Sequence, residues 1–147
     1  GLGIPRNQSM AEKWYLMAAH QDVSEAQFAL GMMYYGNHCD NTSCGNALQW
    51  FMLAALQNNH DAENMLGNMF QDGEAVTVNY QEALKWYRLA AKAGHPEAEF
   101  NLGCMYYYAR GVTKNNSFAV MWMNRAAQKG NLKASEFIRV ARLEKFL

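Results

Sequence analysis

The sequence predicts an all-α fold, a right-handed α-α superhelix (solenoid) of antiparallel helix pairs with a 36-residue repeat. Three observations predict it. Tryptophan recurs every 36 residues, alanine recurs at fixed distances from each tryptophan, and no segment alternates between apolar and polar residues as a strand would. The four tryptophans are Trp14, Trp50, Trp86 and Trp122. A period of this length is typical of an array in which one helix pair stacks on copies of itself.

The tryptophan lies on one helix of each pair, which we call helix B. A residue able to cap a helix stands seven positions before each tryptophan, and alanines follow at the spacing of one helix face. The expected capping residues are Asn7, Ser43, Asn79 and Asn115. The sequence therefore predicts copies of helix B near residues 8–20, 44–57, 80–93 and 116–129.

A second block in the same phase predicts the other helix, helix A. It places alanine, leucine and an aromatic residue four positions apart, on one helix face. The expected copies lie near residues 24–36, 60–72, 96–108 and 132–146. Gly31, Gly67 and Gly103 follow the leucine, although glycine inside a helix costs about 1 kcal/mol relative to alanine. We therefore expect a neighbouring helix to approach closely there, with the paired alanines of helix B as its partners.

The chain is expected to form a single solenoid domain over residues 1–147, large enough for one continuous core. Its expected parts are a partial repeat 1–23, repeats 24–59, 60–95 and 96–131, and a C-terminal capping helix 132–147. Because the chain opens at Gly1 on the loop before a helix B, we expect a piece of a longer protein. Trp86 should be largely buried between the helices of its repeat and the next helix A.

Composition and motifs exclude several classes of function. The chain has 13 basic and 13 acidic residues and no basic block, which argues against binding to nucleic acid. It has no run of about 18 apolar residues, so no membrane span is predicted. It also lacks the short motifs of serine hydrolases, zinc proteases and phosphate-binding loops. We therefore expect a protein that is not an enzyme and uses no cofactor.

Cys39 and Cys44 flank a short segment, next to His38 and Asp40. Three interpretations stay open. A local disulfide would imply an oxidising compartment. Two ordinary thiols would carry no information about the compartment. A metal site is the third interpretation, although the spacing of these residues matches no usual zinc pattern. Cys104 would be unpaired in each case. Cysteine usage thus leaves the compartment open, with a periplasmic or secreted location slightly favoured over the cytoplasm.

The combined motif is Leu-Gly-x-x-Tyr, Gly-Val, a capping residue, Ala-x-x-Trp-Tyr and Ala-Ala-x-x-Gly. It resembles the Sel-one-like repeat family, a relative of the tetratricopeptide repeats. Residues 98–130 resemble the family most, and residues 62–94 follow closely. Residues 26–58 depart from it in one loop, where Cys39 and Asp40 stand in place of the family's Gly and Val. The resemblance covers nearly the whole chain.

The resemblance implies a scaffold or adaptor that binds a protein or peptide, in settings such as bacterial signalling, secretion or toxin immunity. The alternative is a binder of small ligands or cell-wall fragments, as for some relatives with paired cysteines. Those relatives carry a cysteine pair in nearly every repeat, whereas this chain has two cysteines in one loop and one elsewhere. The resemblance therefore favours protein binding.

In tetratricopeptide-like solenoids helix A lines the concave face, so the resemblance implies which positions of helix A meet a partner. The expected partner-binding residues are Phe28, Met32, Tyr35, Asn64, Asn68, Gln71, Phe100 and Tyr107. Aromatic side chains supply much of the energy of peptide recognition, and amides can bind a peptide backbone. Tyr35 and Tyr107 are expected to be exposed. The alternative for Phe28 and Phe100 is a place in the core between A helices.

Overall fold

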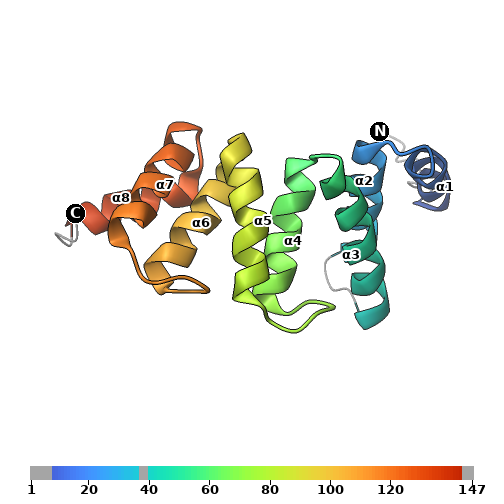
Figure 1. Cartoon of the computed structure of the whole chain (residues 1–147). Coiled ribbons are helices and arrows are strands. Elements are labelled where there is room, and N and C mark those ends of the chain that lie inside the picture. Colours follow the sequence, from blue (N-terminus) through green and yellow to red (C-terminus); the bar gives the residue numbers. More distant parts are fainter. Residues whose placement is uncertain (1–7, 37–39, 144–147) are drawn as a thin grey trace. The chain divides into compact units, whose positions relative to one another are not determined.

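The structure, a computed structural model, describes residues 8–36 and 40–143. These residues form eight α-helices and no strand (Figure 1), which confirms the predicted all-α class. The helices are α1 Gln8–Ala19, α2 Ser24–Tyr35, α3 Asn41–Leu56, α4 His60–Asp72, α5 Tyr80–Ala93, α6 Pro96–Tyr108, α7 Asn116–Gln128 and α8 Leu132–Leu143. Helix B corresponds to the odd-numbered helices and helix A to the even-numbered ones. The largest difference from the expected bounds is at α3, which begins at Asn41 rather than near residue 44.

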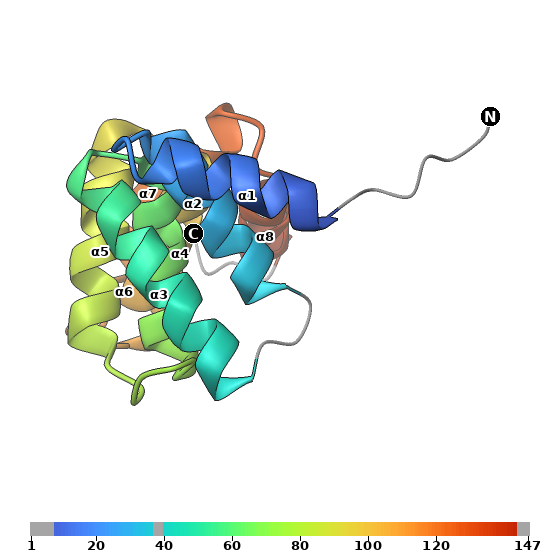
Figure 2. The same ribbon diagram turned by 90° about the vertical axis from the view of Figure 1, so that its right-hand side faces the viewer.

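The chain divides into two compact units, residues 1–62 and residues 63–147. In the first unit α2 packs against both α1 and α3 (Figure 2). In the second unit α6 packs against both α5 and α7, and α7 packs in turn against α8. Each helix of these pairs is thus covered by its neighbour in the sequence. None of the helices within residues 8–36 and 40–143 has the length and apolar character needed to cross a bilayer.

Side-chain caps fix where the B helices begin. The Oδ1 atom of Asn79 accepts hydrogen bonds from the N–H groups of Gln81 and Glu82, each at 3.1 Å. The Oδ1 atom of Asn115 accepts from Phe118 N–H at 2.9 Å, so both predicted caps are confirmed. At α3 the prediction of Ser43 is wrong, because Asp40 is the cap and accepts a 2.8 Å hydrogen bond from Ser43 N–H. Asn7 lies outside the described residues.

A second series of caps, which was not predicted, starts the A helices. Asn59 Oδ1 accepts from Ala62 N–H at 3.0 Å, His95 Nδ1 accepts from Ala98 N–H at 3.2 Å, and Asn131 Oδ1 accepts from Ala134 N–H at 2.9 Å. The signal was present, since these residues are 36 apart and directly precede helix A. Val23 holds the same position before α2 and makes no such bond.

We expect Asn79→Ala to lower the free energy of unfolding by about 1 kcal/mol, because two N–H groups of the first turn of α5 lose their acceptor. Asn79→Asp is the matched control, since it keeps a side-chain acceptor and should cost only a few tenths of that. Urea denaturation followed by circular dichroism measures both. Equal losses for the two variants would show that the cap bond is not the cause.

In α3, α5 and α7 the residue that follows the tryptophan is fully buried. Phe51, Tyr87 and Met123 are 0% exposed. Trp86 is partly buried, whereas Trp14 is 65% exposed.

Each of these three buried residues lies against a glycine of the preceding helix A. A Cβ atom added to Gly31 would lie 2.4 Å from Cε1 of Phe51, and one added to Gly67 would lie 2.4 Å from Cε1 of Tyr87. The same addition to Gly103 would lie 2.7 Å from Cγ of Met123. The predicted close approach at these glycines is therefore confirmed. The predicted partners are wrong, because large side chains rather than the paired alanines fill the space.

The last helix presents one apolar face to the core of the second unit. Ala134, Ile138 and Ala141 are at most 9% exposed, and Phe137 packs against the same buried cluster. Arg139, which stands where the other repeats have glycine, is exposed and donates from Nε to Oε2 of Glu136 at 2.9 Å.

Candidate functional site

In the second unit three asparagine side chains connect α4 to α6. The Nδ2 group of Asn101 donates to Oδ1 of Asn64 at 3.1 Å and to Oδ1 of Asn68 at 3.3 Å. The Oδ1 atom of Asn68 also accepts from the hydroxyl of buried Tyr87 at 2.8 Å. We call Asn64, Asn68 and Asn101 the amide cluster. Two donors use both lone pairs of the Asn68 oxygen, which fixes the orientation of that amide.

One donor and one acceptor of the amide cluster remain available to a ligand. The Nδ2 group of Asn68 makes only a weak 3.9 Å contact with Sδ of Met65. Among the described residues, Oδ1 of Asn101 has no hydrogen-bond donor. A donor and an acceptor on neighbouring side chains can bind the C=O and N–H of a peptide group. Asn64 is only 6% exposed, so it positions Asn101 rather than facing solvent as expected.

Asn101 itself was not predicted. It stands directly before the repeat's leucine, where the two preceding repeats have Ala29 and Met65. A single amide at an otherwise apolar position was the only signal for it in the sequence. Gln71, which was predicted, lies outside the amide cluster and donates to Oδ1 of Asp72 at 3.2 Å.

Aromatic side chains gather on α6 and α8. The ring of Tyr107 meets the ring of Phe137 edge-on, with centroids 5.0 Å apart. Phe100 and Phe137 pack against the buried cluster between α7 and α8, which supports the core alternative for Phe100. Lysine ammonium groups lie over two of the rings, Lys114 at 5.3 Å from Tyr107 and Lys133 at 5.9 Å from Phe100. We call Phe100, Tyr107 and Phe137 the aromatic patch. Tyr107 is partly buried rather than exposed as expected.

Cys104 packs beside the aromatic patch, against the same buried cluster. Burial raises the pKa of the Cys104 thiol to about 11, so the thiol stays protonated near neutral pH and is a poor nucleophile. Of the predicted cysteine pair, Cys44 is buried and Cys39 lies outside the described residues, so the pairing stays a prediction. Within residues 8–36 and 40–143 no group of three His, Cys, Asp or Glu side chains is placed to hold a metal ion.

In the first unit the predicted residues of α2 surround one buried ring. The centroid of Phe51 lies 5.7 Å from that of Phe28 and 6.2 Å from that of Tyr35. Phe28 and Tyr35 are both partly buried, so they support the core of this unit as well as its surface. Met32, on the same helix, is 42% exposed and is the most accessible of the three.

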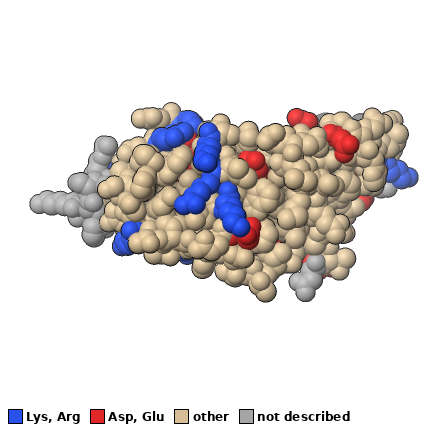
Figure 3. Space-filling model, in the orientation of Figure 1, with Lys and Arg blue, Asp and Glu red and all other residues tan. Residues whose placement is uncertain are grey.

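The two units carry opposite charge, although the whole chain is neutral. Residues 1–62 hold two basic and five acidic side chains, whereas residues 63–147 hold eleven basic and eight acidic ones. On the face drawn in Figure 3 most of the Lys and Arg side chains lie over the second unit. Charge patches of one sign attract partners of the other sign. The net charge of zero for the whole chain conceals this asymmetry.

Comparison with known proteins gives one family. The model of the Sel1 repeat matches residues 1–23, 24–59, 60–95 and 96–131. The crystal structure of a Sel1 repeat protein from Oxalobacter formigenes is 36% identical, with a TM-score of 0.83 over 96% of this chain and 58% of that one. A protective antigen of uropathogenic Escherichia coli with an SLR fold is 30% identical, with a TM-score of 0.88 over 99% of this chain and 31% of that one.

Cysteine rich protein B of Helicobacter pylori is similar in fold alone, at 19% identity and a TM-score of 0.69 over 93% of this chain and 98% of that one. No curated protein sequence matches the chain significantly. The chain spans only 58% and 31% of the first two similar structures, so it corresponds to part of their length. The family model nevertheless matches four consecutive stretches that account for most of this chain. The chain therefore belongs to the Sel1 repeat family of all-α solenoid repeats, which are generally protein-interaction modules.

Proposed function

We propose that this protein is a non-catalytic adaptor that binds a partner polypeptide on its A helices. The observation that carries the proposal is the amide cluster of the second unit. It offers the Nδ2 donor of Asn68 and the Oδ1 acceptor of Asn101 on α4 and α6, held in place by partly buried hydrogen bonds. An extended segment of a partner can pair one peptide group with these two amides without any reaction taking place.

The aromatic patch supplies the second part of the proposed site. Tyr107 and Phe100 lie on α6, the helix that also carries Asn101. A partner that hydrogen-bonds to the amide cluster can place an apolar side chain on these rings, where burial of aromatic surface gives most of the binding energy. Lys114 lies over Tyr107 and suits an acidic residue beside that apolar anchor. The proposed ligand of the second unit is therefore an extended segment with an apolar and an acidic residue.

The first unit is proposed to contribute a separate apolar contact. Met32 is exposed on α2, and Phe28 and Tyr35 flank it with partly buried rings. Methionine adapts its shape to different apolar side chains, which suits a secondary contact. In the second unit, Gln71 is a further proposed contact, an amide near the end of α4.

We expect Tyr107→Ala to weaken binding by about thirtyfold or more, the effect of removing a hot-spot aromatic residue. Peptides selected from a displayed random library against the full chain serve as ligands, and fluorescence anisotropy measures their dissociation constants. Tyr80→Ala is the matched control, because Tyr80 belongs to the same unit but lies outside the aromatic patch. Both variants should keep the helical content of the parent.

Two outcomes would contradict the proposed site. One is a selected peptide that binds Tyr107→Ala and the parent chain equally well. The other is Asn101→Leu without effect on affinity, since this change removes the acceptor on which pairing with a peptide group depends. A library that yields no binding peptide at all would contradict peptide recognition by this chain.

A further inference from the structure

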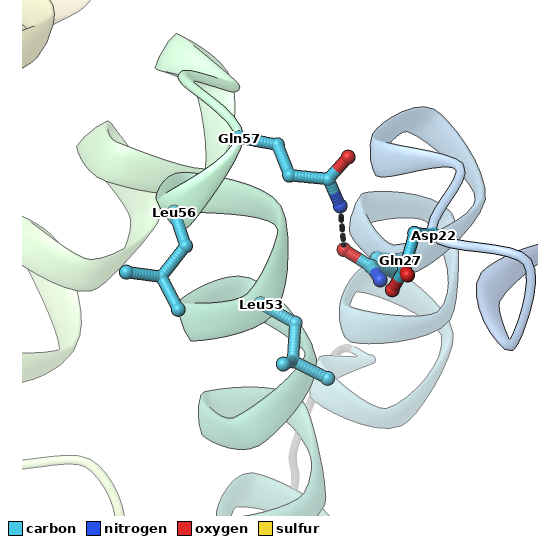
Figure 4. A pocket seen from close by; sticks show the side chains of 5 residues that line it. All are labelled: Asp22, Gln27, Leu53, Leu56 and Gln57. Carbon is cyan, nitrogen blue, oxygen red and sulfur yellow. Dashed lines mark hydrogen bonds between the residues drawn. The ribbon is translucent and has the colours of Figure 1, made fainter.

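The first unit contains a pocket that the proposed function does not use. Its volume is about 320 Å³, and Asp22, Gln27, Leu53, Leu56 and Gln57 line it (Figure 4). The two leucines project from α3 and are 43% and 77% exposed, so one wall is apolar and open to solvent. Asp22 and Gln27 line the pocket on the side across from Gln57, and these three residues form its polar part.

The polar part of the pocket offers acceptors. Gln27 is 1% exposed, and its Nε2 group donates to the carbonyl oxygen of Ala19 at 3.2 Å. Its Oε1 atom accepts from Nε2 of Gln57 at 2.8 Å and has a second lone pair. Among the described residues the structure gives the Asp22 carboxylate no partner. An apolar wall beside a carboxylate and an amide oxygen suits a cation on an aliphatic chain.

The second unit holds the same arrangement two repeats later, with the cation included. At the equivalent positions, 72 residues later, Glu99 stands in place of Gln27 and Lys129 in place of Gln57. The Nζ group of Lys129 donates to Oε1 of Glu99 at 2.8 Å, the length of the Gln57–Gln27 bond. The equivalent of Leu53 is Arg125, whose guanidinium lies 3.0 Å from Oε1 of Glu99. The second unit thus provides its own cations at the place where the first unit has a pocket.

The position of Asp22 strengthens the comparison. Its equivalent in the second unit is Gly94, whose carbonyl oxygen accepts from Nζ of Lys129 at 2.9 Å. A Cβ atom added to Gly94 would lie 2.9 Å from that same ammonium nitrogen. Both residues have a left-handed backbone, with φ of 57° at Asp22 and 94° at Gly94. The Asp22 side chain therefore begins where the second unit holds its ammonium group.

We propose that this pocket binds the side chain of a lysine from a partner polypeptide. The aliphatic part of the lysine lies along Leu53 and Leu56, and its ammonium group lies between the Asp22 carboxylate and Oε1 of Gln27. The acidic excess of residues 1–62 attracts such a basic segment, since it holds five acidic and two basic side chains. This site shares no residue with the amide cluster or the aromatic patch, so it does not depend on the proposed function.

The test titrates the ¹⁵N-labelled full chain with the capped tripeptide Gly-Lys-Gly and with its norleucine counterpart, which lacks the ammonium group. Nuclear magnetic resonance follows the side-chain amides of Gln27 and Gln57. We expect saturable shifts with the lysine peptide and binding at least about threefold weaker for norleucine, the effect of one ion pair. Asp22→Asn should weaken lysine binding to a similar degree, and asparagine tolerates the left-handed backbone at this position.

Two further variants separate the pocket from its surroundings. Glu25→Gln is the matched control, because it removes one exposed carboxylate from the same unit without touching the pocket, and it should leave lysine binding unchanged. The triple variant Gln27→Glu, Leu53→Arg and Gln57→Lys copies the second unit. Because it lacks the two reporter side chains, its titration is followed on the backbone N–H signals of Asp22 and Leu56. It should keep the helical content of the parent and show no saturable shift, since its own cations fill the space.

The proposal is overturned if no saturable shift occurs up to about 20 mM lysine peptide, a concentration that would reveal even weak binding. Equal binding of the norleucine peptide would also overturn it, in favour of an apolar pocket. The same holds if Glu25→Gln weakens binding as much as Asp22→Asn, which would indicate a diffuse acidic surface. Should the triple variant fail to fold, Asp22→Asn against Glu25→Gln still decides the question. Tyr107→Ala should not affect this titration, so the two proposals fail separately.

Discussion

Tyr87→Ala is expected to lower the free energy of unfolding of the second unit by about 3–5 kcal/mol, the usual cost of removing a buried aromatic ring. Tyr87 is 0% exposed, its ring lies on Gly67, and its hydroxyl donates to Asn68 at 2.8 Å. Burial raises the pKa of Tyr87 above its ordinary value, so the hydroxyl remains a donor at neutral pH. Urea denaturation measures the loss.

A second substitution isolates the contact between Tyr87 and Gly67. Gly67→Ala alone should cost about 1–3 kcal/mol or more, because the added Cβ would lie 2.4 Å from the tyrosine ring. In the Tyr87→Ala background the same change should be neutral or stabilising, since the ring is gone and alanine favours helix. Additive effects of the two changes would contradict the contact. Tyr87→Phe keeps the ring and should cost only about 1 kcal/mol.

Removal of both cations next to Glu99 is expected to destabilise the second unit by about 3 kcal/mol. The Glu99 side chain is 0% exposed, and its Oε1 atom contacts Arg125 at 3.0 Å and Lys129 at 2.8 Å. Within the described residues its Oε2 atom has no hydrogen-bond partner. Arg125→Leu with Lys129→Gln would leave a buried carboxylate without compensation. The expected cost lies at the low end for buried pairs, because both cations are partly exposed to water.

The first unit provides the matched rescue for this experiment. Adding Glu99→Gln to the double variant gives the second unit the glutamine pair and leucine found at Gln27, Gln57 and Leu53. We expect this triple variant to regain most of the lost stability, because no charge remains buried. Thermal and urea denaturation of the three chains provide the comparison. A triple variant as unstable as the double variant would show that packing, not charge, explains the loss.

The positions of the helices could be predicted from the sequence because they depend on local signals. Alanine and leucine spacing marks the helical faces, and residues such as Asn79 and Asn115 satisfy the first N–H groups directly. The start of α3 was misplaced because Asp40 and Ser43 are both good caps three residues apart. Only the folded chain shows that Asp40 accepts the hydrogen bond from Ser43.

The identity of the buried core residue was harder to predict, since neighbours on a helix point about 100° apart. The size and the period of tryptophan indicated a core residue. The fully buried residue is instead Tyr87, which lies four residues from both Ala83 and Ala91, buried on the same face. That spacing was the available signal. The amide cluster had no comparable signal, because Asn64 and Asn101 are 37 residues apart and meet only when α4 and α6 pack.

The contacts between glycine and large side chains also bear on how the chain folds. Gly31 and Phe51, Gly67 and Tyr87, and Gly103 and Met123 are each separated by 20 residues along the sequence. Closing such a short loop costs little entropy, and domains rich in local contacts fold quickly. Each contact can form as soon as the next helix B has been synthesised. A growing chain of this kind can bury the apolar face of each new helix in turn. Little apolar surface therefore stays exposed until later residues have been synthesised.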